Sequence, residues 1–433
     1  MRKTILALLA ALVTLCAFAT AQGTAEDWVK RGSELLAEGS IEETTQAWNN
    51  ALQLYNERIE QNPDDVDALI EKAKLLDRMV HLKSEPGVIR DASNETIVAI
   101  DKVLEVDPNS SEALLQKGRS LYHLGLTGYL IQERDKFFAK SIEAFDNAVE
   151  EDPTNVYALK QKGFVLAQWG RLEEWMGKYE EGQNKWEESL NAYDKAIETG
   201  FPGYDFNYQS VDNDSKASNV FYAAVWDGKA LALYKLGRYN ESLQAYDKAI
   251  DPSYMPGVPL VNKGLVFSEL GMYDEAIDAF DEALELDSTL GTALRHKGDV
   301  LLELGRYEEA LEAFNQSIAL AQYWPIPWEG KGLALERLGW NEEASKAYEE
   351  ALELYNESIE RSPNDVKEWG DKGDFLNKIE EYEKAIEAFD KAIEIYPEFS
   401  PAWQGKGDAL MALGKNTEAE AAFTKARELG YKT

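Results

Sequence analysis

The sequence predicts an all-α fold, an α-solenoid in which about ten helical hairpins follow one another along the chain. The first observation is a fixed period, since Gly264, Gly298 and Gly332 follow one another at intervals of 34 residues within similar segments. A period of this length is typical of stacked repeats. The second observation is that apolar residues within each period recur at helical spacing. The third is that prolines such as Pro153 and Pro397 stand between periods, where a helix has to end.

The chain begins with a segment that predicts export. Arg2 and Lys3 precede an apolar run over residues 5–18, and Ala19-Thr20-Ala21 follows. This order is that of a secretory signal peptide, residues 1–21, cleaved before Gln22. The apolar run is shorter than the roughly 20 residues of a spanning helix. We therefore expect an exported, extracytoplasmic protein, secreted or associated with the cell envelope, without an integral membrane domain after signal removal. An uncleaved membrane anchor is the alternative.

Composition excludes several classes of function. Cys16 is the only cysteine and lies in the predicted signal peptide, so the mature chain has no disulfide and no cysteine metal site. Leu15 stands before it, where lipid attachment would require a small residue. The formal net charge of −34 argues against a nucleic-acid partner, because phosphate binding needs a basic surface.

Ten repeat units can be placed by one small residue that recurs in each. The spacings between successive anchors are 41, 45, 45, 67, 34, 34, 34, 41 and 34 residues. Residues 22–222 are therefore expected to hold irregular repeats with insertions, and residues 223–433 a regular array. The ten anchors are Gly32, Ala73, Gly118, Gly163, Ala230, Gly264, Gly298, Gly332, Gly373 and Gly407.

The longer spacings indicate where the first half departs from the regular period. A spacing of 41 exceeds 34 by seven residues, which is about two helical turns. Residues 51–65 and 351–365 have closely similar sequences, and we interpret both as second helices lengthened by two turns. Larger insertions are expected near residues 80–92, 124–140, 172–188 and 200–223. The last is rich in Gly, Asn, Asp and aromatic residues and is predicted to be a loop.

Within a regular unit both helices can be predicted from the sequence. Leu294, Val300, Leu301 and Leu304 have the spacing of a buried stripe, and Gly305 follows as a helix stop. A second apolar stripe begins at once and runs over residues 307–318. Small residues at 298 and 310 predict that the two helices cross closely.

These units resemble the tetratricopeptide repeat. The unit that begins at residue 366 has Trp369, Gly373, Ala385, Phe389 and Ala392, followed by a proline, at the family's positions. The resemblance covers about four-fifths of the chain and implies a right-handed superhelix with no separate catalytic domain. Units two to four depart from the family pattern, with alanine at the glycine position of unit two and with Ser141 and Ser189 where alanine is usual.

The resemblance also implies that certain first-helix positions line a concave groove that binds a partner peptide. In this sequence the groove runs from basic through apolar to acidic residues. The family's lysine and asparagine clamp for C-terminal carboxylates is not reproduced. In the alternative interpretation the basic residues only neutralise nearby carboxylates, and the apolar ones are covered by packing. The candidates are Lys74, Arg119, Lys160 and Phe164, then Leu231, Tyr234, Val261, Leu265, Ile326 and Leu333, and last Asp299, Asp374 and Asp408.

No residue pattern predicts catalysis, a cofactor or a metal site. The three histidines, His81, His123 and His296, are scattered and are interpreted as single surface residues. Residues 212–215 begin like a calcium loop, but Lys216 and Ala217 stand where an oxygen ligand and a glycine are needed. The chain is therefore not expected to be an enzyme.

Six Asn-x-Ser/Thr sequons agree with export and are glycosylation candidates. Chance together with the ordinary composition of helix surfaces is the alternative explanation. The asparagines are Asn94, Asn109, Asn213, Asn240, Asn315 and Asn356.

Taken together, these features predict a non-enzymatic protein interaction scaffold that binds a partner peptide in its groove outside the cytoplasm. Two alternatives remain, an envelope protein that binds glycans or cations and an accessory subunit of an enzyme complex.

Overall fold

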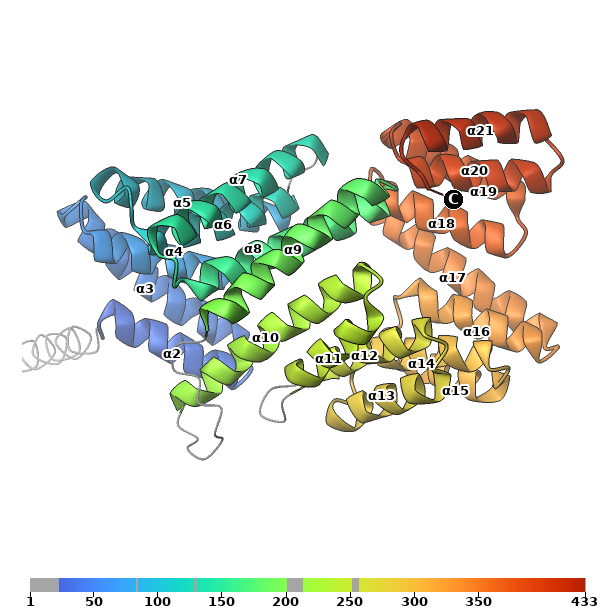
Figure 1. Cartoon of the computed structure of the whole chain (residues 1–433), viewed down its shortest axis with the longest axis horizontal. Coiled ribbons are helices and arrows are strands. Elements are labelled where there is room, and N and C mark those ends of the chain that lie inside the picture. Colours follow the sequence, from blue (N-terminus) through green and yellow to red (C-terminus); the bar gives the residue numbers. More distant parts are fainter. Residues whose placement is uncertain (1–22, 83–84, 128–130, 201–212, 251–256, 433) are drawn as a thin grey trace, which may run out of the picture. The chain divides into compact units, whose positions relative to one another are not determined.

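The computed structural model describes residues 23–82, 85–127, 131–200, 213–250 and 257–432. This part of the chain forms 20 helices and no strand (Figure 1). The predicted signal peptide and residues 201–212 of the predicted loop lie outside the described residues. The loop prediction over 200–223 is wrong for residues 213–223, which belong to a helix. Among the residues described, every helix is too short or too polar to cross a membrane.

The helices alternate as first and second members of ten hairpins in the described chain, which confirms the predicted all-α solenoid. The first helices are α2 (Ala25–Ala37), α4 (Val66–Val80), α6 (Ser111–Thr127), α8 (Val156–Trp175), α10 (Asn213–Lys235), α12 (Gly257–Glu269), α14 (Gly291–Glu303), α16 (Pro325–Arg337), α18 (Val366–Lys378) and α20 (Ser400–Ala412). The second helices are α3 (Ile41–Gln61), α5 (Pro86–Val106), α7 (Ile131–Glu151), α9 (Tyr179–Thr199), α11 (Tyr239–Ala249), α13 (Tyr273–Leu286), α15 (Tyr307–Leu320), α17 (Asn341–Arg361), α19 (Tyr382–Ile395) and α21 (Asn416–Glu428).

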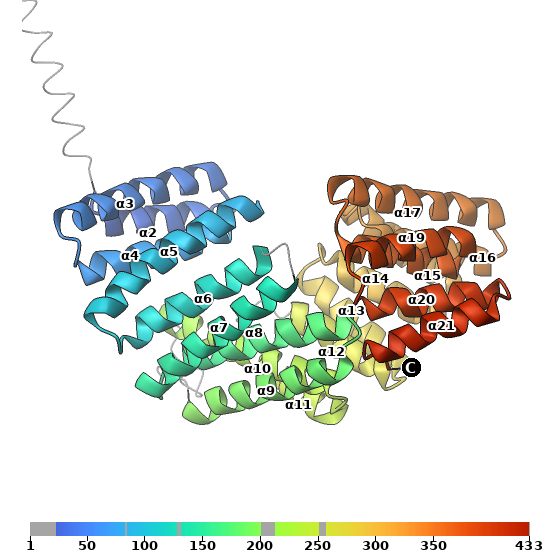
Figure 2. The ribbon, with the colours of Figure 1, turned by 90° about the horizontal axis from the view of Figure 1, so that it is seen from above.

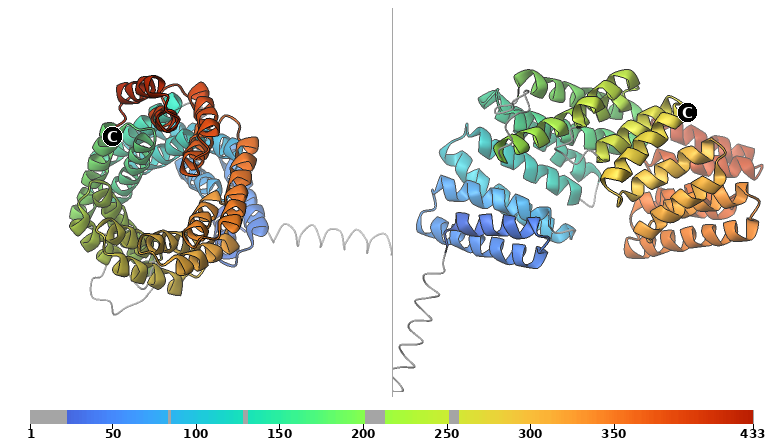
Figure 3. Two further views of the ribbon diagram at one scale, coloured as in Figure 1. Left: turned by 90° about the vertical axis from the view of Figure 1, so that its right-hand side faces the viewer. Right: turned by 90° about the horizontal axis from the view of Figure 1, so that it is seen from below.

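The chain divides into two compact units, residues 1–165 and 166–433. Within each unit, successive hairpins lie side by side (Figures 2 and 3). The predicted division at residues 222 and 223 separates irregular from regular repeats. It falls inside the second unit and stays a prediction.

Second helices occur in two main lengths. Helices α13, α15 and α19 have 14 residues, whereas α3, α5, α7, α9 and α17 have 21. The predicted two-turn extension is confirmed in α3 and α17. In the described residues, the insertions expected near 80–92, 124–140 and 172–188 mostly extend helices. Seven extra residues are nearly two whole turns, so the apolar stripe keeps its direction and the helix can lengthen without a loop.

Most hairpin cores are built around an aromatic ring on the second helix that packs onto a glycine of the first. The hairpin of α4 and α5 differs, because it has Ala73 at the glycine position and no aromatic residue on α5. Phe314 of α15 is fully buried between Gly298 of its own hairpin and Gly330 of the next. A Cβ atom added to Gly298 or Gly330 would lie 2.7 Å or 2.4 Å from that ring. Any larger residue at either glycine would therefore displace the ring or push the helices apart. This contact agrees with the close helix crossing that the small residue at 298 predicts.

A ladder of ion pairs joins successive hairpins. The lysine just before the anchor glycine reaches back 16 residues, to an aspartate on the preceding second helix. The Nζ to Oδ1 distance is 2.7 Å for Lys117 and Asp101, 2.7 Å for Lys263 and Asp247, and 2.5 Å for Lys406 and Asp390. These lysines explain the recurring Lys-Gly dipeptide as a contact between repeats.

In the second unit the last hairpin returns to the first. Ser400 Oγ donates a hydrogen bond of 3.0 Å to the carbonyl of Met176, and the rings of Trp175 and Phe399 lie 4.7 Å apart between centroids. Tyr431 lies across Tyr179, with 5.8 Å between ring centroids. The α8–α9 turn and the start of α20 are therefore held together although 224 residues separate the bonded pair.

Candidate functional site

Four consecutive first helices of the second unit bring carboxylates together on one surface. Asp299 lies on α14, Glu329 on α16, Asp371 and Asp374 on α18, and Asp408 on α20. These five residues are called the carboxylate surface below. Each is close enough to another to influence its ionisation, since Glu329 acts on both Asp299 and Asp374, and Asp371 and Asp408 act on Asp374.

Glu329 holds the middle of this surface and is itself well ordered by hydrogen bonds. Its side chain is 11% exposed. Tyr355 donates its hydroxyl to Glu329 Oε1 at 2.5 Å, and Lys378 donates to Oε2 at 3.0 Å. Two more of the five acids also have a basic partner, because Arg295 pairs with Asp299 at 2.7 Å and Lys367 pairs with Asp371. Three cations therefore face five acids, and the surface keeps a small excess of negative charge.

Desolvation is the main reason why the ionised forms of three of these carboxylates are unfavourable. Burial raises the pKa of Asp299 to about 6, with Arg295 and Lys378 opposing and Glu329 adding to the shift. Desolvation, followed by the charge of Asp371, raises the pKa of Asp374 to about 6. Burial also raises the pKa of Asp408. A cationic partner would stabilise the ionised form of a carboxylate, and this effect is largest where the pKa is raised.

We expect the contribution of Asp299 to the stability of the protein to rise as the pH falls from about 7 to about 5, whereas His296, whose pKa is lowered, acts in the opposite direction. An unfolded aspartate has a pKa of about 3.9. Because the folded-state pKa of Asp299 is higher, the folded chain takes up protons in this interval and is stabilised by them. Asp299→Asn should flatten the rise, measured as the thermal midpoint against pH. Asp374→Asn should act in the same direction and less strongly, because Asp374 is more exposed.

The matched control for this experiment is Asp287→Asn. Hydrogen bonds from the Thr289 hydroxyl and backbone N–H hold the pKa of Asp287 below its usual value. The stability that Asp287 contributes is present above the unfolded pKa and is lost as the pH falls below it. The control should leave the rise between pH 7 and 5 unchanged, and an equal flattening in both variants would contradict the assignment.

The predicted apolar groove residues differ in how far they reach the surface. Leu333 is 36% exposed and stands four residues after Glu329 on α16, so both lie on one face of that helix. Leu231 and Leu265 are partly buried against the cores of their hairpins. Val261 is 6% exposed and belongs to a core. Tyr234 and Ile326 are half-buried.

The predicted basic residues lie in the first unit and are mostly neutralised. Lys74 pairs with Glu71 at 2.8 Å and with Glu112 at 2.5 Å, and Arg119 pairs with Asp77. Lys160 forms no ion pair within the described part of the chain, and burial together with Arg119 lowers its pKa.

Phe164 contacts the ring of Tyr122 edge-on, with 5.5 Å between centroids. The arrangement of these residues agrees with the alternative in which lysine and arginine offset carboxylates. The groove assignment itself stays a prediction.

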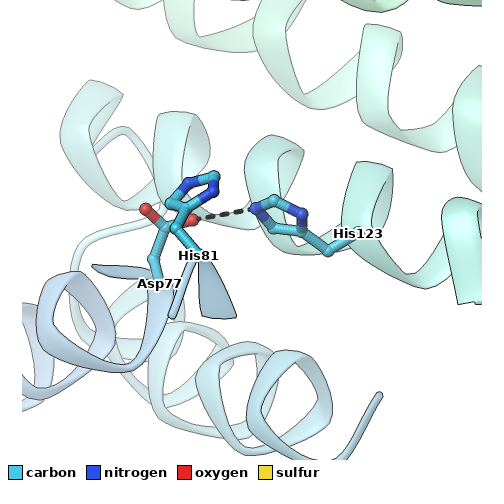
Figure 4. A group of neighbouring side chains, drawn as sticks. All are labelled: Asp77, His81 and His123. Atoms are coloured by element: carbon cyan, nitrogen blue, oxygen red, sulfur yellow. Dashed lines mark ion pairs between the residues drawn. The ribbon is translucent and has the colours of Figure 1, made fainter. Parts of the chain in front are cut away.

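One side-chain cluster in the first unit was not predicted. Asp77 and His81 stand four residues apart at the end of α4, and His123 comes from α6 (Figure 4). The interpretation of the histidines as single surface residues was wrong for His123, which is 7% exposed, and it overlooked Asp77 one turn before His81. The side chain of Asp77 is 2% exposed. Burial acts to raise its pKa, but His123 and then Arg119 outweigh burial and hold the pKa below the usual value.

His81 and His123 lie close together although 42 positions separate them, with 5.3 Å between ring centroids. Desolvation lowers the pKa of His81, and the charges of His123 and Arg119 add to this effect. The cluster borders a cavity of about 60 Å³ that is lined by Tyr122, Phe145 and Phe164.

The third histidine, His296, lies beside Arg295 in the second unit. Burial and Arg295 lower its pKa to about 3, so it is neutral.

The sequon asparagines that the structure describes, at 94, 109, 240, 315 and 356, are all exposed, and the side chain of Asn213 lies outside the described residues. The hydroxyl residue of several sequons has a structural role. Ser242 donates to the carbonyl of Ala230 at 2.7 Å, and Ser317 donates to that of Gly291 at 2.8 Å. These serines are used for helix packing, so part of the sequon excess follows from the fold. Glycosylation stays a prediction.

Two of the five members of the carboxylate surface were missed by sequence reasoning, Glu329 and Asp371. Asp299, Asp374 and Asp408 each follow an anchor glycine directly, so they could be placed by register. Glu329 and Asp371 occupy other positions of their helices. Helical spacing could have indicated them, because Asp371 stands three residues before Asp374 on α18 and Glu329 stands four residues before Leu333 on α16.

Family models for the tetratricopeptide repeat match residues 223–251, 257–322, 289–364 and 378–431. A search of curated proteins finds no match. Yeast Tom70 is 12% identical, with 93% of this chain and 96% of that chain covered and a TM-score of 0.41.

Two further solved structures are similar to parts of the chain. A tetratricopeptide repeat protein from Parabacteroides merdae ATCC 43184 is 15% identical, covering 63% and 95% of the two chains at a TM-score of 0.39. MamA from Desulfovibrio magneticus RS-1 is 22% identical, covering 48% and 94% at 0.25.

Proposed function

Because the chain is a multi-repeat tetratricopeptide repeat protein, we propose that it is a non-enzymatic scaffold that binds a basic segment of a partner protein. Proteins of this family bind protein partners. The carboxylate surface is the binding site in this proposal. It combines five acids on four successive first helices with raised pKa values at Asp299, Asp374 and Asp408.

The gathering of five acids on four successive helices, with three cations beside them, carries the proposal. The raised pKa values support it, since partial desolvation is their main cause and repulsion between neighbouring acids adds to it at Asp299 and Asp374. Lysine or arginine side chains of a partner would relieve this repulsion and would also guide the approach of the partner. Leu333, one turn after Glu329, adds an exposed apolar contact beside the acids. A partner segment with basic residues and an apolar side chain fits this chemistry best.

The proposed location of the scaffold is outside the cytoplasm. This part of the proposal rests on residues 1–21, with their basic start, short apolar run and small residues before Gln22.

The experiment compares charge reversal on the two helices of one hairpin. Asp374→Lys on α18 changes the carboxylate surface, and Glu387→Lys makes the same change of charge at an exposed position on α19. Each protein is applied to an array of synthetic peptides of basic, neutral and acidic composition. The wild type and the α19 variant should select basic peptides, whereas Asp374→Lys should weaken this binding at least about tenfold.

Salt and an apolar substitution complete the test. Binding of basic peptides should weaken as salt is added, since exposed charges are screened. Leu333→Asp should weaken the binding of peptides that carry an apolar residue more than that of purely basic ones. Equal binding of acidic and basic peptides, or equal effects of the two lysine variants, would reject this site.

A further inference from the structure

We propose that Asp77, His81 and His123 form a binding site for a divalent transition metal ion of the Zn²⁺ class. The site lies in the first unit, apart from the carboxylate surface, and does not depend on the proposed function. One ligand oxygen of Asp77 and one ring nitrogen of each histidine all lie within 4.8 Å of one another (Figure 4).

The donor set suits zinc better than calcium or magnesium. Two imidazole nitrogens and one carboxylate oxygen are typical ligands of Zn²⁺, whereas calcium and magnesium prefer oxygen donors alone. Three protein ligands leave a fourth position for water or for a group from outside the chain. His81 is exposed, so that position can be reached from solvent.

The spacing of the ligands is close to that of a bound ion. Bonds of about 2.0–2.1 Å at tetrahedral angles place ligand atoms roughly 3.4 Å apart. Asp77 Oδ1 and His123 Nε2 are already 3.3 Å apart. The remaining ligand is His81, which follows the last residue of α4, is exposed, and has a ring nitrogen within 4.8 Å of the other two ligand atoms. Only His81 therefore has to move for the site to close around an ion.

An unsatisfied buried oxygen points to a cation. Asp77 uses Oδ2 for the ion pair with Arg119, while its Oδ1 is buried and has only His123 Nε2 beside it, at 3.3 Å and without a hydrogen bond of good geometry. A buried carboxylate oxygen that is so poorly satisfied is costly. A metal ion on Oδ1 would satisfy it, and Arg119 would then orient the carboxylate from the far side, as partners of metal ligands commonly do.

The test uses the untagged full chain, freed of metal by dialysis against a chelator. Zn²⁺ is titrated in competition with a chromophoric chelator, and Co²⁺ is added separately to record the visible absorption of a four-coordinate ion. We expect one high-affinity Zn²⁺ per chain, the Co²⁺ spectrum, and a thermal midpoint that rises with Zn²⁺ but not with Ca²⁺.

His81→Ala is the decisive variant, because this exposed side chain can be removed without opening the core. It should weaken Zn²⁺ binding at least about 100-fold, since loss of a supporting partner alone costs up to that much. His296→Ala is the matched control, a histidine of the second unit outside the cluster, and should bind like the wild type. The proposal is overturned if the wild type binds no stoichiometric Zn²⁺, if His81→Ala binds it equally well, or if both variants lose it.

Discussion

Replacing Phe314 by alanine is expected to lower the free energy of unfolding of the second unit by about 3–5 kcal/mol, the range for a large aromatic removed from a core. The ring is fully buried and lies between Gly298 and Gly330 of successive hairpins. Neither glycine has a side chain that could move into the space, so the cavity cannot collapse easily. The upper half of the range is therefore expected. The measurement is chemical denaturation followed by circular dichroism.

The control for this substitution is Leu320→Ala in the same helix. Leu320 is 44% exposed, so its loss should change the unfolding free energy by less than about 0.5 kcal/mol. The denaturation midpoint of Phe314→Ala should fall while the slope stays near that of the wild type. A midpoint equal to that of the Leu320 variant would mean that the ring does not hold the two hairpins together.

The fold could be predicted because the sequence of each repeat contains local signals for its own two helices. Period, anchor glycine and apolar spacing agree in residues 257–320, and α12 to α15 follow them closely. The lengths of α5, α7 and α9 were harder. Added helical turns change the spacing between repeats, so a fixed period does not reveal them. A seven-residue extension could be recognised only because residues 51–65 and 351–365 have similar sequences.

The sites were predicted less completely because they depend on which helices meet. Asp299, Asp374 and Asp408 could be placed, since equivalent positions of neighbouring repeats lie side by side. The cluster in the first unit needed the contact between α4 and α6. His81 and His123 are distant in sequence, and nothing in their local pattern reveals that both face Asp77.

Sequence reasoning also could not separate exposed from buried groove positions. Leu231, Leu265 and Leu333 occupy the same register position, yet only Leu333 is exposed, at 36%. The difference arises from the particular side chains of the flanking helices. A period describes backbone positions, whereas exposure depends on the neighbours at each of them.

The second large effect is expected for Arg119→Met, which should destabilise the first unit by about 3 kcal/mol. The Asp77 side chain is 2% exposed and keeps one oxygen on Arg119. Without the guanidinium, the buried carboxylate keeps only the histidines beside it, and its desolvation is no longer fully offset. The double variant Asp77→Leu with Arg119→Met removes both charges and should be more stable than the single variant. Arg31→Met is the control, because Arg31 is 54% exposed and its pair with Glu34 contributes little.

Zinc connects this result with the proposed metal site. A divalent ion on Asp77 Oδ1 would supply positive charge in place of the guanidinium, so Zn²⁺ should restore part of the stability that Arg119→Met loses. It should not restore the Asp77→Leu double variant, which has no carboxylate to bind the ion. Loss of stability without recovery in Zn²⁺ would support the buried ion pair and count against the metal site. If Arg119→Met is as stable as Arg31→Met, Asp77 does not need the guanidinium of Arg119. The free-energy cost of burying its carboxylate would then be small.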